Sequence, residues 1–149
     1  MLDSDVLLRQ ADQQCQERGV RFTPIRRRVL EMISGTPGGL KAYDLLDRLS
    51  DEHASARPPT VYRALDFLVG HGFAHKIERL NAFIACVHPS HSHTPAFMIC
   101  RLCDAVAEAQ SSPARGALGD AARATGFRIE RTVVEASGVC PACIDKADA

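Results

Sequence analysis

The sequence contains no apolar run approaching the roughly 18 residues that a membrane-spanning helix requires. Its first residues, MLDSDVLLRQADQQ, include early acidic side chains and no apolar stretch long enough for a signal peptide. We therefore expect a cytoplasmic protein without membrane contacts. Disulfides are rare in that compartment, so the six cysteines indicate metal or redox chemistry instead.

An excess of positive charge is also lacking, because 18 basic residues balance 18 acidic ones. The chain-wide basic bias that would point to nucleic acid is thus absent. Charge is nevertheless uneven along the chain. Between positions 18 and 28 there are five basic side chains and no acid: Arg18, Arg21, Arg26, Arg27 and Arg28. By itself this run fits a solvated helix face as well as a phosphate-binding one.

Aromatic residues are few, at 5%, while hydrophobic residues make up an ordinary 46% of the 149 positions. A chain of this length forms one domain or two small ones. Two lobes of about 70 to 80 residues would each be marginally stable and would depend on a metal or a second subunit. A stretch rich in His, Pro and Ser marks a boundary, and we expect domains at 1–84 and 95–149 joined by a hinge at 85–94.

Helical periodicity dominates the first lobe. A first helix ends at Gly19, a second begins after the cap Thr23, AYDLLDRL gives a third, and RPPTVYRALDFLVGHG gives a fourth. On the fourth helix the apolar residues share one side, and Arg63 lies on the opposite side. The following segment, FAHKIERLNAFIAC, alternates around an RLN turn and predicts a two-stranded hairpin. Helices followed by a hairpin indicate a winged helix-turn-helix domain.

Shorter elements are expected in the second lobe. AFMICRLC and AVAEA predict strands, and SPARGALGDAARATG predicts a helix closed by Gly126. FRIERTVVEA has the strongest alternation in the chain and predicts a further strand. The fold class is therefore α+β, with an N-terminal winged helix-turn-helix domain and a small C-terminal α/β domain.

Two CxxC pairs, Cys100/Cys103 and Cys140/Cys143, stand with 36 residues between them. Two such pairs can place four thiolates around one tetrahedral zinc ion. The alternative is redox chemistry, because CPAC resembles a thioredoxin-type motif, but that motif needs a long helix after it and only six residues follow. We expect structural zinc. A site closed by four thiolates has no open position, so it should stabilise the lobe and neither catalyse nor sense.

The remaining cysteine and histidine side chains could form a second metal site. Cys15 lies on the inner face of the first helix, where a buried thiol is expected. His75 falls in the first hairpin strand, Cys86 ends the second, and His93 lies in the hinge. With a carboxylate these residues would form a mixed site suited to zinc. Spacing alone does not decide whether they share one ion.

Five segments between about residues 5 and 145 match the motifs of a known family in their order and spacing: RFTPIRRRVLEMI, AYDLL, PPTVYRALDFLVGHGFAHKIE, FMICRLC and GVCPAC. Together they resemble the ferric uptake regulator superfamily, and in detail its zinc uptake regulator branch. The resemblance covers nearly the whole chain. It implies a homodimer, held by the C-terminal domain, that binds double-stranded operator DNA and represses zinc-uptake genes when zinc is bound.

The resemblance also implies two zinc ions per subunit. The structural ion would be held by Cys100, Cys103, Cys140 and Cys143, and the regulatory ion by His75, Cys86, His93 and Glu108. Two further histidines, His88 and His91, remain unassigned. Either of them replaces His93, or they form a weak third site, or they are solvated.

Arg63 is the residue that we most expect to contact a DNA base, because its planar guanidinium can contact guanine O6 and N7 together. Tyr43 resembles a family residue that contacts a base. We expect Thr60 and Tyr62 to bind phosphates or to lie beside Arg63. The alternative for Tyr62 is that its side chain is partly buried. One or two of Arg26, Arg27 and Arg28 are expected to reach phosphates, because three consecutive helical positions cannot all face one surface.

An enzyme is not expected. A nucleobase deaminase would show H-x-E together with P-C-x-x-C, and neither occurs. Two alternatives remain: a regulator of the same fold that senses iron, manganese, nickel or peroxide, and a zinc-stabilised interaction module without DNA binding. The regulator with another signal stays open because the geometry of a metal site can also accept metals other than zinc. The interaction module is disfavoured by the segment PPTVYRALDFL.

Overall fold

The computed structural model describes residues 3–36, 38–52, 54, 56–86, 96–108, 114–130 and 132–147, without the side chains of 114 and 115. The chain divides into two compact units, Met1–Ser92 and His93–Ala149. Within the described part of the chain, no helix is long and apolar enough to cross a membrane. The predicted hinge at 85–94 lies almost entirely outside the described residues.

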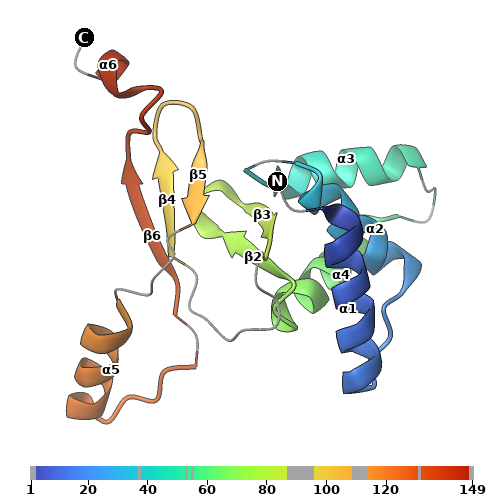
Figure 1. Ribbon diagram of the computed structural model, residues 1–149, viewed down its shortest axis with the longest axis horizontal. Helices are drawn as coiled ribbons and strands as arrows, with labels where there is room; N and C mark the ends of the chain where they lie inside the picture. Colours follow the sequence, from blue (N-terminus) through green and yellow to red (C-terminus); the bar gives the residue numbers. More distant parts are fainter. Residues whose placement is uncertain are drawn as a thin grey trace. The chain divides into compact units, whose positions relative to one another are not determined.

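The first unit combines four helices with a three-stranded antiparallel sheet in the order β1-β3-β2. Its elements are α1 (Ser4–Arg18), α2 (Pro24–Ser34), β1 (Leu40–Lys41), α3 (Ala42–Glu52), α4 (Pro58–Gly70), β2 (Ala74–Ile77), the 3-10 turn η1 (Glu78–Leu80) and β3 (Ala82–Ala85) (Figure 1). This is a winged helix-turn-helix domain, as predicted. The turn closes at Asn81, which has a φ of 46°.

Local sequence signals set the helix ends. Gly19 ends α1 with a φ of 69°, a left-handed conformation that glycine adopts without steric cost. The Thr23 side chain accepts a hydrogen bond from the backbone N–H of Arg26 and so caps α2, with Pro24 in its first turn. Both boundaries agree with the prediction. They fix the angle at which the chain passes from α1 into α2.

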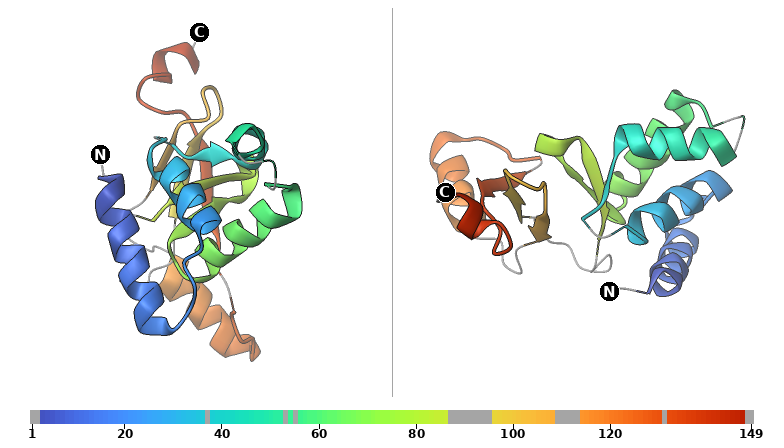
Figure 2. Two further views of the ribbon diagram at one scale, coloured as in Figure 1. Left: turned by 90° about the vertical axis from the view of Figure 1, so that its right-hand side faces the viewer. Right: turned by 90° about the horizontal axis from the view of Figure 1, so that it is seen from above.

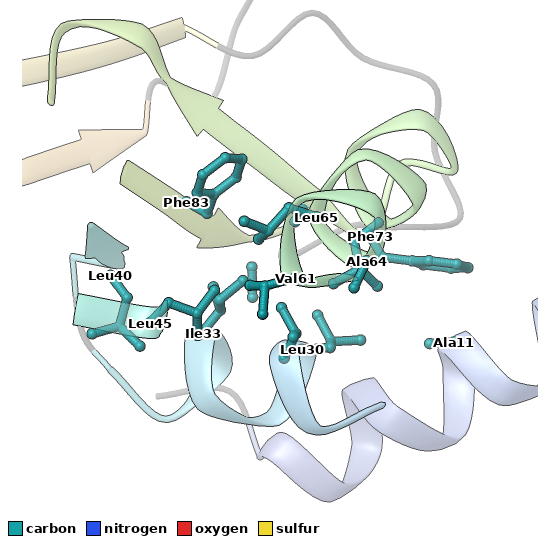
Figure 3. Close-up of a cluster of buried hydrophobic side chains, with 14 of the residues drawn as sticks. Ala11, Leu30, Ile33, Leu40, Leu45, Val61, Ala64, Leu65, Phe73 and Phe83 are labelled. Atoms are coloured by element: carbon teal, nitrogen blue, oxygen red, sulfur yellow. The ribbon is translucent and has the colours of Figure 1, made fainter. Parts of the chain in front are cut away.

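The core of the first unit lies between the helices and the sheet (Figure 3). Val61, Leu65 and Leu68 of α4 are fully buried and pack with residues of α1, α2, α3 and the strands. The right-hand view of Figure 2 shows these helices on one side of the sheet. Burying one such leucine stabilises the fold by about 1.5 to 3 kcal/mol. The buried stripe of α4 therefore decides which residues of this helix face solvent.

The second unit is built on another three-stranded sheet, in the order β5-β4-β6. Its elements are β4 (Ala96–Cys100), β5 (Val106–Glu108), α5 (Ala114–Thr125), β6 (Val134–Gly138) and the short α6 (Ile144–Ala147). The central strand β4 is antiparallel to β5 and parallel to β6 (Figure 1). α5 ends at Gly126, as predicted, with a φ of 74°.

One strand prediction was wrong in its extent. The alternating segment FRIERTVVEA predicted a strand from residue 127, but β6 begins only at Val134, and residues 127–130 are not in a strand. The physical reason is pairing. Ala96, the first residue of β4, pairs with Val134, so β4 offers no strand residue opposite the earlier positions. β1, which is two residues long and pairs with β3, was not predicted from the sequence.

Candidate metal centre and nucleic-acid face

The two CxxC pairs leave the sheet of the second unit at the same edge. Cys100 is the last residue of β4, and Cys140 follows the end of β6 by two positions. Because β4 and β6 are parallel neighbours, with Cys100 opposite Gly138, their carboxyl ends lie together. The backbone N–H of Arg101 donates to the carbonyl of Gly138 at 2.9 Å and extends this pairing beyond β4.

Each pair forms a tight turn. The N–H of Asp104 donates to the carbonyl of Cys100 at 3.0 Å, and Asp104 adopts a φ of 60°. In the second turn, the N–H of Cys143 donates to the carbonyl of Cys140 at 2.9 Å, after which α6 begins. α6 has four residues, which is far shorter than the helix that follows a thioredoxin-type motif.

The four sulfur atoms form one cluster, with all of them within 4.8 Å of one another. The sulfurs of Cys103 and Cys140, one from each turn, are 3.7 Å apart. Zinc–sulfur bonds are about 2.3 Å long, so the sulfurs of a tetrahedral site lie about 3.8 Å apart. The donor set and its spacing therefore fit a tetrahedral zinc ion held by Cys100, Cys103, Cys140 and Cys143.

The ionisation of these thiols also favours a cation. A hydrogen bond from the backbone N–H of Cys140 lowers the pKa of Cys100 to about 6. Hydrogen bonds with the sulfurs of Cys140 and Cys103 raise the pKa of Cys143 to about 12. The N–H of Ala105 lowers the pKa of Cys103, but its contacts with Cys100 and Cys140 and its burial together raise it. One thiolate thus forms readily, and a divalent ion would stabilise the others as thiolates.

Two of the predicted regulatory ligands lie on the hairpin of the first unit. His75 pairs with Ile84 across β2 and β3, and the N–H of Cys86 donates to the carbonyl of Phe73 at 2.9 Å. Alternate strand residues share a face, so His75 and Cys86 project from the same side of the hairpin as diagonal neighbours. Cys86 is buried, and so is the Nε2 atom of His75.

The other predicted regulatory ligands belong to different parts of the chain. Glu108 is the last residue of β5, in the second unit, and it is half-buried. His93 lies outside the described residues, as do His88 and His91. Their assignments stay predictions.

The solvent side of α4 carries the predicted DNA-contacting residues. Thr60, Tyr62 and Arg63 are exposed. Val61, which lies between Thr60 and Tyr62, is buried, and so is Leu65. Tyr62 has 41% of its surface exposed, which is compatible both with a contact to DNA and with the alternative of partial burial. Tyr43, near the start of α3, is 78% exposed and is therefore accessible to a binding partner.

The arginine run makes contacts within the first unit. Arg26 lies over the ring of Phe67 at 3.8 Å, and Arg27 lies over Phe22 at 5.5 Å. Arg27 also lies 3.7 Å from the carboxylate of Asp12. Arg28 forms ion pairs with Glu52 of α3 at 2.5 Å and with Glu31 at 2.8 Å. These contacts leave open whether Arg26 and Arg27 also reach phosphates, as predicted.

One set of contacts was not predicted at all. The guanidinium of Arg18, at the end of α1, donates to the carbonyl of His71, the residue that caps α4. The sequence signal for this contact is weak, because nothing in the spacing of positions 18 and 71 links them. Only the packing of α1 against α2, and of α2 against α4, brings the two helix ends together.

Known proteins resemble this chain along its full length. The model of the ferric uptake regulator family matches residues 17–137. The zinc uptake regulation protein of Escherichia coli (strain K12) is 43% identical over 140 residues, which are 93% of this chain and 82% of that protein. A structure of a zinc uptake regulator complexed with zinc and DNA superposes with a TM-score of 0.91 at 40% identity and covers 100% of both chains. The crystal structure of holo XcZur gives a TM-score of 0.83 at 40% identity over 99% of this chain and 100% of that one.

Proposed function

Because the chain belongs to the ferric uptake regulator family, and within it to the zinc uptake regulators, we propose that it is a zinc-responsive transcriptional repressor that binds operator DNA as a homodimer. The observation that carries this proposal is the similarity, over 100% of the chain, to a zinc uptake regulator complexed with zinc and DNA. Members of this family regulate transcription and are not enzymes. A regulator of this kind works where the DNA is, so we place it in the cytoplasm.

One zinc ion would be structural. Cys100, Cys103, Cys140 and Cys143 supply four thiolates and leave no coordination position for water or substrate. Bound zinc would join the turn after β4 to the turn after β6 and would stabilise the small second unit. The ion would not take part in a reaction.

A second zinc ion would be regulatory, held by His75, Cys86, His93 and Glu108. The support from the first unit is that His75 and Cys86 share one face of the hairpin and offer a nitrogen and a sulfur ligand, both suited to zinc. Since Glu108 belongs to the second unit, an ion that takes all four ligands would restrict movement between the units. Zinc would then favour the DNA-binding geometry, and by linkage DNA would raise the affinity for zinc.

DNA would be read by the exposed side of α4. Arg63 would contact a base edge in the major groove, with Tyr43 as a second base contact and with Thr60 and Tyr62 beside the reader. Arg27 is a candidate for a phosphate contact, because its ion pair with Asp12 is exposed and long.

Dimerisation would use the second unit. Several large apolar side chains are exposed there and could be covered by a second subunit: Leu118, Phe127, Ile129 and Val133. In such a dimer, the regulatory zinc ion would set the distance between the two α4 helices. Two half-sites about one helical turn of DNA apart accept only a narrow range of such distances.

A titration of DNA binding against buffered free zinc tests the proposed function. The protein is first stripped of regulatory metal, and the probe is a labelled duplex from upstream of a zinc-importer operon, with an unrelated duplex as the control. We expect binding that rises with free zinc and is not matched by iron(II), manganese(II) or nickel(II) at their physiological concentrations. Binding driven by one of these metals instead would show a regulator of the same fold with another signal.

A further inference from the structure

The carboxyl end of α4 is surrounded by two arginines and several aromatic rings. Along this cluster, Arg26 lies over Phe67, Phe67 lies beside His71 with ring centroids 4.4 Å apart, and His71 stacks on Phe73 at 6.3 Å. Arg18 lies on the far side, 5.5 Å from the centre of the Phe73 ring. Three helices thus meet at the last turn of α4, with Arg18 from α1 and Arg26 from α2.

Arg18 makes the polar contacts of this cluster. One of its terminal nitrogens donates to the carbonyl of His71 at 2.8 Å and lies 3.4 Å from Nδ1 of the same residue. The other terminal nitrogen donates to the side-chain oxygen of Gln14 at 2.9 Å, which holds the guanidinium in place from within α1. The last carbonyls of a helix lack partners inside the helix and carry its negative dipole end, so a cation there stabilises the helix end.

Arg26 holds the opposite side of the same turn. Its guanidinium lies 3.8 Å from the centre of the Phe67 ring, a close cation–π contact, and it donates to the carbonyl of Arg21 at 2.5 Å. The two arginines therefore contact Phe67 and the C-cap residue His71, which lie four positions apart at the end of α4, from two different helices. Both belong to the basic run between positions 18 and 28, of which Arg26 was among the expected phosphate contacts.

We propose that Arg18 and Arg26 are positioning residues, which fix the direction of α4 from its carboxyl end so that Arg63, in the middle of the helix, meets the DNA bases. The proposal rests on the DNA-binding function argued above. It assigns to both arginines a role inside the protein, whereas the sequence pattern suggested contact with phosphates for Arg26 and no specific role for Arg18.

The length of α4 explains why its far end matters. Arg63 lies eight residues before His71, about 12 Å along the helix axis, so a tilt of about 5° at the carboxyl end displaces it by about 1 Å. A bidentate contact from arginine to guanine tolerates a displacement of only about 0.5 Å. Small errors at His71 would therefore be felt at Arg63.

The salt dependence of DNA binding separates positioning from phosphate contact. Every arginine that neutralises a phosphate contributes about 0.9 to the slope of the logarithm of the binding constant against the logarithm of the salt concentration. A residue that acts only inside the protein lowers the affinity and leaves this slope unchanged. Lysine gives a further distinction, because it replaces arginine at a phosphate but cannot bridge two acceptors with a planar fork.

The test uses Arg18→Ala and Arg18→Lys, with Arg9→Ala as the matched control. Arg9 lies on the same helix, is exposed, and donates to the carbonyl of Asp5 within α1, so its replacement removes the same charge without touching α4. DNA affinity of the zinc-loaded, full-length dimer is measured over roughly 50 to 300 mM salt, at a temperature where circular dichroism shows each variant folded.

We expect Arg18→Ala to bind the duplex about ten-fold more weakly with an unchanged salt slope, Arg18→Lys to recover only part of the loss, and Arg9→Ala to bind like wild type. Four results would overturn the proposal: a slope reduced by about one, full recovery by lysine, an equal loss in Arg9→Ala, or an unchanged affinity in Arg18→Ala. Arg26→Ala is expected to behave like Arg18→Ala. If wild type itself shows no zinc-dependent binding, the proposed function fails, and that result is distinguishable from each of the four.

Discussion

The sulfur atoms of Cys103 and Cys140 lie 3.7 Å apart, although 37 positions separate them in the chain. The parallel pairing of β4 with β6 produces this proximity, because it places the ends of the two strands side by side. The cluster of four sulfurs is therefore a product of the sheet. Zinc bound there would fix the strand ends that create the site.

Removing one of these thiolates should cost the whole structural ion. We predict that Cys100→Ser contains one zinc equivalent fewer per subunit than wild type, because three thiolates no longer close the tetrahedron. The second unit should then unfold or dissociate, since it is too small to be stable without its metal. Metal analysis and size-exclusion chromatography check both expectations. Cys15→Ala, which changes a buried thiol of the first unit, is the control.

A Cys100→Ser protein with full zinc content and an unchanged melting temperature would contradict the assignment of this cluster as the structural site. A drop in zinc content in Cys15→Ala alone would contradict it as well.

Zinc binding at this cluster should release protons in a number set by the thiol pKa values. At pH 7 the thiol of Cys143, with a pKa of about 12, and that of Cys103, whose pKa is raised, are protonated, so zinc must displace at least two protons. Below pH 6, Cys100 is protonated too and adds a third. Because protons bind the metal-free form, zinc affinity falls as the pH falls, and more steeply below pH 6.

Isothermal titration calorimetry in buffers of different ionisation enthalpy counts these protons. The Cys86→Ser variant is used, so that only the structural site takes up zinc. A heat of binding that is independent of the buffer at pH 7 would contradict the thiol protonation described here.

Much of the first unit could be predicted from local signals, and the reasons are physical. Gly19 and Thr23 set helix ends through their own backbone and side chain, with no help from distant residues. The apolar stripe of α4 around Leu65 likewise follows from spacing alone. The winged domain and the exposed side of α4 could therefore be predicted from the amino-acid sequence.

The features that could not be predicted depend on distant partners. β1 is a strand only because Leu40 pairs with Phe83, and two residues carry no periodicity of their own. Phe127 shows the opposite case, because its segment alternates like a strand but does not pair with β4. The Phe127 side chain is 76% exposed, which fits a surface covered by a second subunit better than a strand of this sheet. The contact of Arg18 with His71 also needed the packing of helices that the sequence does not specify.

The first unit should lose stability in mild acid because of His71. Burial lowers the pKa of this imidazole below its ordinary value of 6.5, and the charges of Arg18 and Arg26 lower it further. The unfolded chain then binds the proton more readily than the folded one. Stability is full above about pH 6.5 and is lost as the pH falls through the folded-state pKa.

Tyrosine fluorescence reports this unit selectively, since the chain has two tyrosines and no tryptophan, and both tyrosines lie in α3 and α4. We expect urea midpoints at pH 7.5 and pH 5.0 to differ less in His71→Gln than in wild type. An equal difference in both proteins would show that His71 does not titrate in this range.

Arg63 should determine base specificity. We predict that Arg63→Ala weakens operator binding by about 1 to 3 kcal/mol and relaxes discrimination at one base pair. Arg63→Lys should not restore it, because lysine lacks the planar pair of donors. Competition with a set of singly substituted duplexes measures the change at each position. Weakening that is uniform across all duplexes would instead indicate a phosphate contact.

If one zinc ion stabilises the protein and a different one switches it, the Cys86→Ser variant should lose the switch and keep the stability. Zinc content, dimer mass and DNA affinity are measured for this variant and for wild type across one series of buffered free zinc concentrations. We predict a variant that remains dimeric with one zinc equivalent per subunit and does not gain DNA affinity as zinc rises. A variant whose DNA affinity rises with zinc as that of wild type does would contradict the account.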